Sequence, residues 1–96
     1  MLVAHGLFPP MKSRATSRFW SHHGRLPEDI RRAALKQYRL WLQNPRHPSL
    51  QFKKVQAFWS ARITDDYRAL GVLEADTVIW FWIGTHEEYE RLIKGT

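Results

Sequence analysis

The segment that decides the fold runs from Phe58 to Arg91, with the sequence FWSARITDDYRALGVLEADTVIWFWIGTHEEYER. Apolar and polar side chains alternate over Phe58–Thr64, which predicts a strand with one buried face. The pair Asp65-Asp66 is typical of a turn, and Tyr67–Leu73 predicts the returning strand. The first half of the segment therefore predicts an antiparallel hairpin.

The second half of the segment predicts another strand and a helix. Thr77–Gly84 is a nearly continuous apolar run, which is typical of a strand covered on both faces. Glu74-Ala75-Asp76 predicts the turn before this strand. His86–Lys94 begins with acidic residues, which favour the positive end of a helix dipole. We therefore expect a short helix after the last strand.

The N-terminal half predicts one long helix between two weaker strands. Lys12–Trp20 alternates loosely and predicts a first strand, and Phe52–Val55 predicts a short strand before the hairpin. Pro27–Gln43 carries helix-start residues at its beginning, and Asn44-Pro45 ends it. The stripe expected to be buried recurs at helical spacing and comprises Ile30, Ala34, Tyr38 and Trp41.

These elements predict an α+β domain. Its antiparallel sheet has about four strands, with the long helix packed on one face and the short helix at the C-terminal end. We expect residues 11–96 to form this single domain. Residues 1–10, MLVAHGLFPP, lack the basic start of a signal peptide, and we expect them to form a flexible tail.

Composition restricts the class of protein. The apolar fraction of 44% and the aromatic fraction of 14% favour a globular fold. The chain has no cysteine, which excludes disulfides, thiolate zinc sites and cysteine nucleophiles and agrees with a reducing cytoplasm. No apolar run approaches the roughly 18 residues that span a bilayer.

The net charge of +6 is unevenly distributed. Residues 1–54 hold 11 lysines and arginines against 2 acidic residues, whereas residues 55–96 hold 4 against 7. A basic surface favours a phosphate-rich partner such as nucleic acid. The alternative is a well-solvated helix surface. The helix stripe Arg32, Lys36 and Arg39 admits both interpretations, as a phosphate-binding surface or as a solvated face.

Arg62 and Arg68 flank the Asp65-Asp66 turn. If this hairpin contains a bulge, residue 62 pairs with residue 68 and both guanidiniums share one face, where they can grip a phosphate. A strict two-residue turn points them to opposite faces. In the alternative interpretation they are surface arginines that pair with Asp65 or Asp66.

Other candidate residues lie on either side of the hairpin. Lys53 and Lys54 are consecutive on a strand, so one points to each face and at most one joins the arginines. His86 and Tyr89 lie three residues apart at a helix start, where a histidine can act as acid or base and a tyrosine can orient or donate a proton. The alternative is a capping histidine beside a half-buried tyrosine.

A metal site is not expected. The adjacent pair His22-His23 lacks carboxylate or cysteine support. Glycine-rich phosphate loops and serine nucleophile elbows are absent from the sequence. The sequence therefore predicts neither a metal nor another cofactor.

The order of several motifs over about residues 14–94 resembles the RelE/ParE superfamily of bacterial type II toxins. The matching pieces are Leu26-Pro27, NPRHPSL at Asn44–Leu50, FKKV at Phe52–Val55, FWSARITDDYRALGV at Phe58–Val72, and WIGTHEEYERL at Trp82–Leu92. The resemblance implies a small α+β toxin domain that acts in the cytoplasm.

The resemblance also implies an activity. RelE-like members cut messenger RNA, usually on the ribosome, without a metal or other cofactor: the ribose 2′-OH attacks the adjacent phosphate and leaves a cyclic phosphate. A cognate antitoxin protein binds the toxin in a hetero-oligomer. ParE-like members keep the fold and inhibit DNA gyrase. An inactive nucleic-acid-binding module on the same fold is a further alternative.

The resemblance assigns roles by position. Arg62 and Arg68 match the arginines that hold the scissile phosphate, and Lys53 or Lys54 matches lysines that contact the RNA backbone. His86 and Tyr89 match the segment that supplies acid–base or base-stacking residues. The chain departs from the pattern in two places: Gln51 and Lys53 stand where some nucleases have a glutamate base, and His86 and Tyr89 open a helix.

Overall fold

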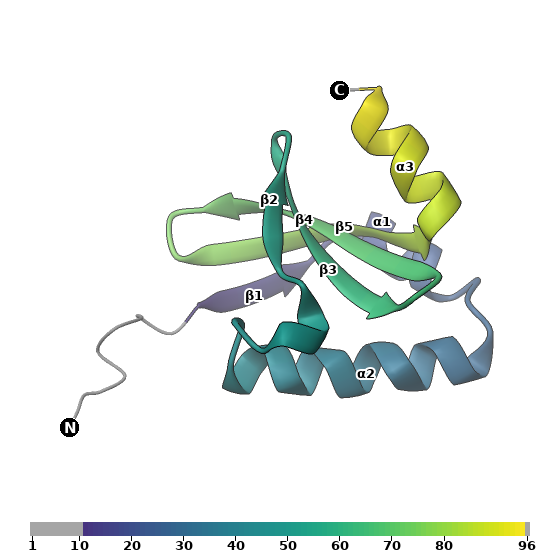
Figure 1. Cartoon of the computed structure of the whole chain (residues 1–96), viewed down its shortest axis with the longest axis horizontal. Coiled ribbons are helices and arrows are strands. Elements are labelled where there is room, and N and C mark those ends of the chain that lie inside the picture. The colour runs from purple at the N-terminus through teal and green to yellow at the C-terminus, as the bar shows by residue number, and fades with distance from the viewer. Residues whose placement is uncertain (1–10, 96) are drawn as a thin grey trace.

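The computed structural model describes residues 11–95, so the expected tail at residues 1–10 lies outside the described residues (Figure 1). In chain order the elements are β1 (Lys12–Ala15), α1 (Ser17–His23), α2 (Glu28–Gln43), a 3-10 helix (Pro48–Leu50), β2 (Lys53–Val55), β3 (Phe58–Thr64), β4 (Tyr67–Glu74), β5 (Thr77–Thr85) and α3 (His86–Lys94). The α+β class, the long helix and the hairpin of the sequence prediction are confirmed. No helix within this part of the chain is long and apolar enough to cross a membrane.

The sheet has five strands in the order β1-β5-β4-β3-β2. Strands β2 to β5 form an antiparallel meander, and β1 pairs parallel to β5 at the edge. The predicted sheet of about four antiparallel strands is therefore corrected to a mixed sheet of five. The short β1 was expected as a strand, but its parallel partner lies 65 positions further along the chain, Lys12 opposite Thr77. No local pattern specifies such a pairing.

The expected strand over Lys12–Trp20 is only half correct, because it ends at Ala15. Thr16 has extended backbone and its side-chain oxygen accepts from the Phe19 amide at 3.1 Å, so it is the N-cap of α1. A capping hydroxyl satisfies an amide that the first helical turn leaves free. The segment from Ser17 onward is therefore helical.

The first core lies between α2 and one face of the sheet, which we call the α2 face (Figure 1). Trp41 is 2% exposed there, and Ile30 and Ala34 pack at its edge, as expected for the helix stripe. The fourth expected member, Tyr38, is 40% exposed instead. Gln37 takes the buried position, because its amide donates to two backbone carbonyls and so satisfies its polar group.

The second core lies on the opposite face, the α3 face, and is built around Leu70, Trp82 and Tyr89. A bulge in β5 makes this possible, since Leu70 pairs with Trp82 and Gly71 pairs with Trp80. The extra residue, Phe81, reverses the alternation along the strand. Trp80 consequently packs in the first core and Trp82 in the second, and the prediction that β5 is covered on both faces is confirmed.

The start of α3 is fixed by a capping box. The Thr85 side chain accepts from the Glu88 amide at 3.2 Å, and the Glu88 carboxylate accepts from the Thr85 amide at 3.2 Å. The hydrogen bonds that the Thr85 amide and hydroxyl donate to the Glu88 carboxylate lower the pKa of Glu88 below its ordinary value of 4.5. Because the folded-state pKa is depressed, this contribution is complete above the ordinary value and is lost as the pH falls through the lowered one.

Gly84 is required where β5 meets α3. A Cβ at this position would lie 2.5 Å from the Trp82 ring and 2.9 Å from the Glu88 carboxylate. We expect Gly84→Ala to lower the free energy of unfolding by about 1–3 kcal/mol, because the buried ring has to move. The measurement is urea unfolding followed by tryptophan fluorescence. Gly24→Ala is the matched control, since its Cβ meets nothing closer than 3.4 Å; equal stability of Gly84→Ala and the parent chain would contradict the prediction.

Candidate functional site

The candidate site begins with the pairing of Arg62 and Arg68. The two residues are direct partners across β3 and β4, and a bulge lies between Arg62 and Thr64. Arg68 is in turn opposite Gly84 of β5. Since partners across a sheet share a face, the two arginines lie in one row on the α3 face, next to the row of Ser60, Leu70 and Trp82. The predicted pairing of residues 62 and 68 is confirmed.

The hairpin turn holds both guanidiniums. Arg62 Nη2 lies 2.5 Å from Asp65 Oδ1, an ion pair that corresponds to the alternative interpretation of these arginines. Arg68 Nη1 donates to the carbonyls of Thr64 at 2.6 Å and Tyr67 at 3.0 Å. These bonds orient the guanidiniums, and the Asp65 carboxylate occupies the place that an anionic ligand of Arg62 would take.

The two arginines affect the protonation of their neighbours. The hydrogen bond and the charge of Arg62 lower the pKa of Asp65, so this carboxyl is ionised throughout the neutral range. Burial, followed by the charge of Arg62, lowers the pKa of Arg68. Because both guanidiniums are cations on the same face of the sheet, an anion that binds beside the pair is attracted by both.

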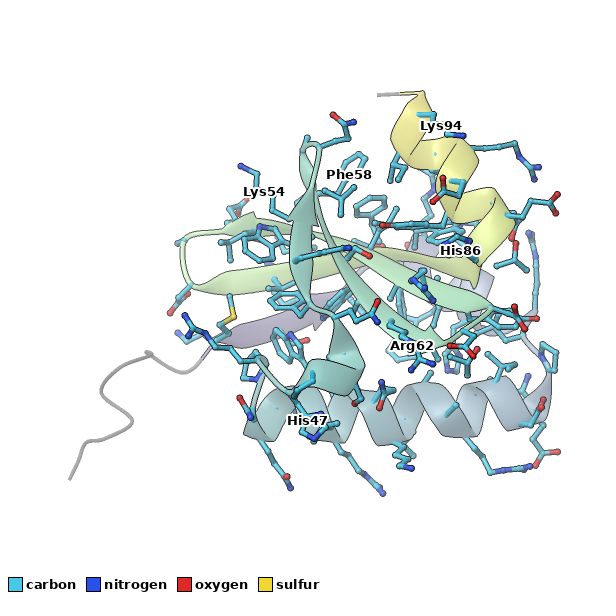
Figure 2. The ribbon with its side chains drawn as sticks, viewed as in Figure 1. His47, Lys54, Phe58, Arg62, His86 and Lys94 are labelled. Carbon is cyan, nitrogen blue, oxygen red and sulfur yellow. The ribbon has the colours of Figure 1, made fainter. Side chains whose placement is uncertain are left out.

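His86 stands beside this hairpin. Its amide donates to the Asp66 carbonyl at 2.7 Å, which fastens the start of α3 to the β3–β4 turn. Figure 2 shows Arg62 and His86 toward the same end of the sheet. His86 Nε2 lies 3.7 Å from Glu90 Oε2 and would form an ion pair with it when protonated.

An open hollow of about 600 Å³ adjoins the imidazole of His86. Its lining includes the carboxylates of Asp66, Glu87 and Glu90. Three carboxylates repel a phosphate. The hollow is therefore an unfavourable place for a phosphodiester.

Tyr89 is a core residue. It is 5% exposed and packs with Leu70 and Trp82, and its ring centroid lies 5.5 Å from that of His86. The sequence could not distinguish a half-buried tyrosine from a catalytic one. In this structure the ring supports the imidazole from within the second core.

The lysines of β2 divide between the faces as expected. Lys53 pairs with Ser60 and so joins the α3 face, two residues along from Arg62, whereas Lys54 pairs with Trp59 on the α2 face. Both side chains are exposed. Only Lys53 can extend the row of arginines toward a bound polyanion.

The basic stripe of α2 lies apart from the arginine row. Arg32, Lys36 and Arg39 are exposed on a helix that packs against the α2 face. Arg32 pairs with Glu28 at 3.0 Å. A ligand bound at Arg62 and Arg68 is on the other side of the sheet, so these three residues do not belong to the same site.

The histidines of α1 are structural neighbours of aromatic rings. The centroid of His22 lies 6.2 Å from that of Trp82, and the centroid of His23 lies 5.2 Å from that of Trp20. Burial, with a smaller effect of Arg31, lowers the pKa of His23 and so favours the neutral imidazole. Among residues 11–95, no three histidine or acidic side chains come together as a candidate metal site.

Two residues that position the site were missed from sequence. Gln37 Nε2 donates to the Arg62 carbonyl at 3.0 Å from α2, and Glu90 pairs with His86 from the next turn of α3. The spacing of four residues between His86 and Glu90 would have indicated the second contact. No sequence pattern indicates the first, because it joins residues 25 positions apart.

Solved structures share this fold. A chain of the toxin–antitoxin complex RelBE2 from Mycobacterium tuberculosis matches with a TM-score of 0.62 and 19% identity over 81% of this chain and 100% of that one. YafQ from E. coli matches with a TM-score of 0.63 and 12% identity, over 82% of this chain and 97% of that one. The YoeB/ParE toxin from Agrobacterium tumefaciens matches with a TM-score of 0.61 and 16% identity, over 79% of this chain and 99% of that one. The molecule therefore has the RelE-like toxin fold.

Sequence similarity identifies the family. Residues 28–91, about two thirds of the chain, match the model of the ParE-like toxin domain. The chain belongs to the ParE-like toxin domain family, and the resemblance to the RelE/ParE superfamily is confirmed. No curated protein matches the chain.

The ion pair of Arg62 and Asp65 generates a test. We expect Asp65→Asn to bind a short, fluorescently labelled polyphosphate about two- to fivefold more tightly at low salt, because the asparagine keeps the turn but releases the guanidinium. Fluorescence anisotropy measures the affinity. Asp76→Asn is the matched control, since Asp76 lies in the β4–β5 turn and pairs with Lys12 at 3.7 Å. The same gain in both variants would show that only net charge matters.

Proposed function

We propose that the chain is the toxin of a toxin–antitoxin pair and that it cleaves messenger RNA, bound on the ribosome, without a metal or other cofactor. The observation that carries this proposal is the row of Arg62 and Arg68 on the α3 face, fastened to the start of α3 by the hydrogen bond from the His86 amide to Asp66. Two guanidiniums and one imidazole are sufficient groups for phosphodiester transfer.

In the proposed reaction the arginines bind the scissile phosphate. Its oxygens displace the Asp65 carboxylate from Arg62, and Arg68 donates from its fixed position in the turn. As the ribose 2′-oxygen attacks phosphorus, negative charge grows on the phosphoryl oxygens, and the guanidiniums stabilise that charge. Lys53 contacts the RNA backbone next to this row.

His86 is the proposed proton-transfer group. In its neutral form the imidazole removes the proton of the 2′-OH, and in its protonated form it supplies a proton to the departing 5′-oxygen. Glu90 Oε2 lies 3.7 Å from the imidazole Nε2, within ion-pair distance of a protonated ring. Tyr89 supports the ring of His86 and is assigned no contact with the RNA, because it is buried.

Removal of the arginines tests the proposal. We expect Arg68→Ala and Arg62→Ala each to slow cleavage of a ribosome-bound message by about 100-fold or more, the loss typical for a group that stabilises transition-state charge. New cyclic-phosphate ends, mapped by sequencing in a cell-free translation system, measure the rate. Arg25→Ala is the matched control, since Arg25 is exposed in the loop before α2.

Substitution of His86 separates chemistry from binding. We expect His86→Gln to cleave about 100-fold more slowly while RNA affinity is retained, because glutamine cannot transfer the proton. Thermal unfolding of each variant checks that the fold is intact. Cleavage at the parent rate by both Arg68→Ala and His86→Gln would reject the nuclease mechanism.

Inhibition of DNA gyrase is the second candidate function. The observations that favour it are the match to the ParE-like domain, the burial of Tyr89 and the carboxylates around His86. It predicts stabilised DNA breaks with translation unaffected. A normal supercoiling assay at saturating protein would reject it, and cyclic-phosphate ends on messenger RNA would favour the nuclease.

A further inference from the structure

Arg62 is the last regular position of β3. On one side of the strand, the pairing with β2 covers Phe58–Ser60 and ends before Arg62 is reached. On the other side, the pairing with β4 is interrupted by the bulge directly after Arg62. A bulge disrupts the ladder of hydrogen bonds locally. The backbone that carries the Arg62 guanidinium is therefore held less firmly by the sheet than the interior of the strand is.

A side chain of α2 holds the backbone at this point. Helix α2 packs beneath the end of β3 (Figure 1), and from it Gln37 Nε2 donates to the Arg62 carbonyl at 3.0 Å. The same nitrogen donates to the carbonyl of Ser49, in the 3-10 helix, at 3.3 Å. A side-chain amide has two N–H donors, so both are used. The bond to Ser49 thereby fixes the direction of the bond to Arg62.

The surroundings of Gln37 are those of a core residue. Its side chain is 8% exposed, and in the described residues 11–95 the buried polar side chains are Gln37 and Ser60. Together with Trp41, Leu50 and Ile63 it lines a small interior cavity of about 60 Å³. Burial of an amide costs free energy unless the amide is hydrogen-bonded. The two carbonyls that Gln37 holds therefore explain why an amide is tolerated in the first core.

The two arginines of the pair are supported in different ways. The Arg68 side chain is fixed by the turn itself, because its Nη1 donates to the carbonyls of Thr64 and Tyr67. The Arg62 guanidinium instead contacts the exposed carboxylate of Asp65. An anionic ligand of Arg62 displaces that carboxylate. Once it is displaced, the position of the Arg62 guanidinium depends on its own backbone.

We propose that Gln37 is a positioning residue for Arg62. It holds the carbonyl of residue 62 where the sheet no longer does, and so sets where the Arg62 guanidinium stands relative to that of Arg68. Gln37 acts from the α2 face, so it does not touch an anion bound on the α3 face. Two guanidiniums grip one phosphate only when their separation matches its oxygens. The effect on anion binding is independent of the reaction, whereas the effect on cleavage rests on the proposed function.

The test is a double-mutant cycle on the full chain, with a short, fluorescently labelled polyphosphate as the probe. Gln37→Met removes both donors and keeps an unbranched side chain with similar helix propensity. We expect it to weaken binding about three- to fivefold at low salt in the parent chain and in Arg68→Ala. In Arg62→Ala we expect Gln37→Met to have no further effect, because the group that it positions is absent. Fluorescence anisotropy measures each affinity.

Gln43→Met is the matched control, since Gln43 is exposed in the last turn of the same helix. We expect it to bind polyphosphate like the parent chain. Thermal unfolding of each variant shows whether it is folded at the assay temperature.

A measurement on the parent chain needs no substitution at position 37. Linkage requires that an anion whose affinity depends on the hydrogen bond of Gln37 protects that bond by the same factor. We expect saturating polyphosphate to slow hydrogen exchange of the Gln37 side-chain amide about three- to fivefold, measured by nuclear magnetic resonance. An unchanged exchange rate contradicts the inference even if Gln37→Met fails to fold.

The effect on cleavage is measured separately. On a ribosome-bound message we expect Gln37→Met to lower kcat about tenfold, because a misplaced guanidinium stabilises less of the charge that grows in the transition state. Gln43→Met should cleave at the parent rate.

The outcomes separate the two proposals. If the cycle behaves as expected but the parent chain cuts no messenger RNA, the nuclease proposal fails and the positioning role is supported. If Gln37→Met weakens binding equally in Arg62→Ala and Arg68→Ala, Gln37 acts on the fold as a whole and the inference is overturned. It is also overturned if folded Gln37→Met binds like the parent chain, or if the parent chain binds polyphosphate no more tightly than Arg62→Ala.

Discussion

One bulge in β5 fixes the arrangement of the whole domain. In a regular strand Trp80 and Trp82 would point to the same face, but the extra residue Phe81 sends them to opposite faces. A 96-residue chain buries a smaller fraction of its surface than a larger domain does. One indole on each face of the sheet therefore gives both the α2 face and the α3 face a large buried side chain. The packing around these rings also leaves no room for a side chain at two glycines. A Cβ at Gly71 would lie 2.9 Å from Val78 Cγ1 and 3.1 Å from the Trp80 ring, and one at Gly84 would lie 2.5 Å from the Trp82 ring.

The two arginines of the candidate site are held by neighbours in sequence. The β3–β4 turn supplies Asp65 and the carbonyls that hold Arg68, and the next hydrogen bond across the sheet fastens α3. Such a site is orientated before any ligand arrives, which reduces the entropy lost on binding. The ion pair of Arg62 and Asp65 acts in the opposite sense, because an anionic ligand has to compete with a carboxylate.

The sequence predicted those elements of the fold that depend on a pattern among neighbouring residues. Alternation and turn residues predicted β3, and the acidic residues at its start predicted α3. The spacing of Arg62 and Arg68 predicted their pairing if the hairpin contained a bulge. Sequence patterns did not predict the features of the fold that depend on contacts between distant residues or on a cap. The parallel pairing of β1 with β5 depends on residues 65 positions apart, and the helical state of Ser17–His23 depends on the Thr16 cap. Periodicity placed Tyr38 in the core, but the carbonyls of Ser49 and Arg62 make Gln37 the better buried neighbour.

The contact between Gln37 and β3 has a consequence for what residue 62 contributes to the fold. The amide of Gln37 binds the backbone carbonyl of residue 62, and the arginine side chain takes no part in this bond. The hydrogen bond between α2 and β3 therefore does not depend on which side chain residue 62 carries. The backbone contact and the displayed guanidinium are thus separate features of one residue, so the same fold can carry a different chemical group at this position.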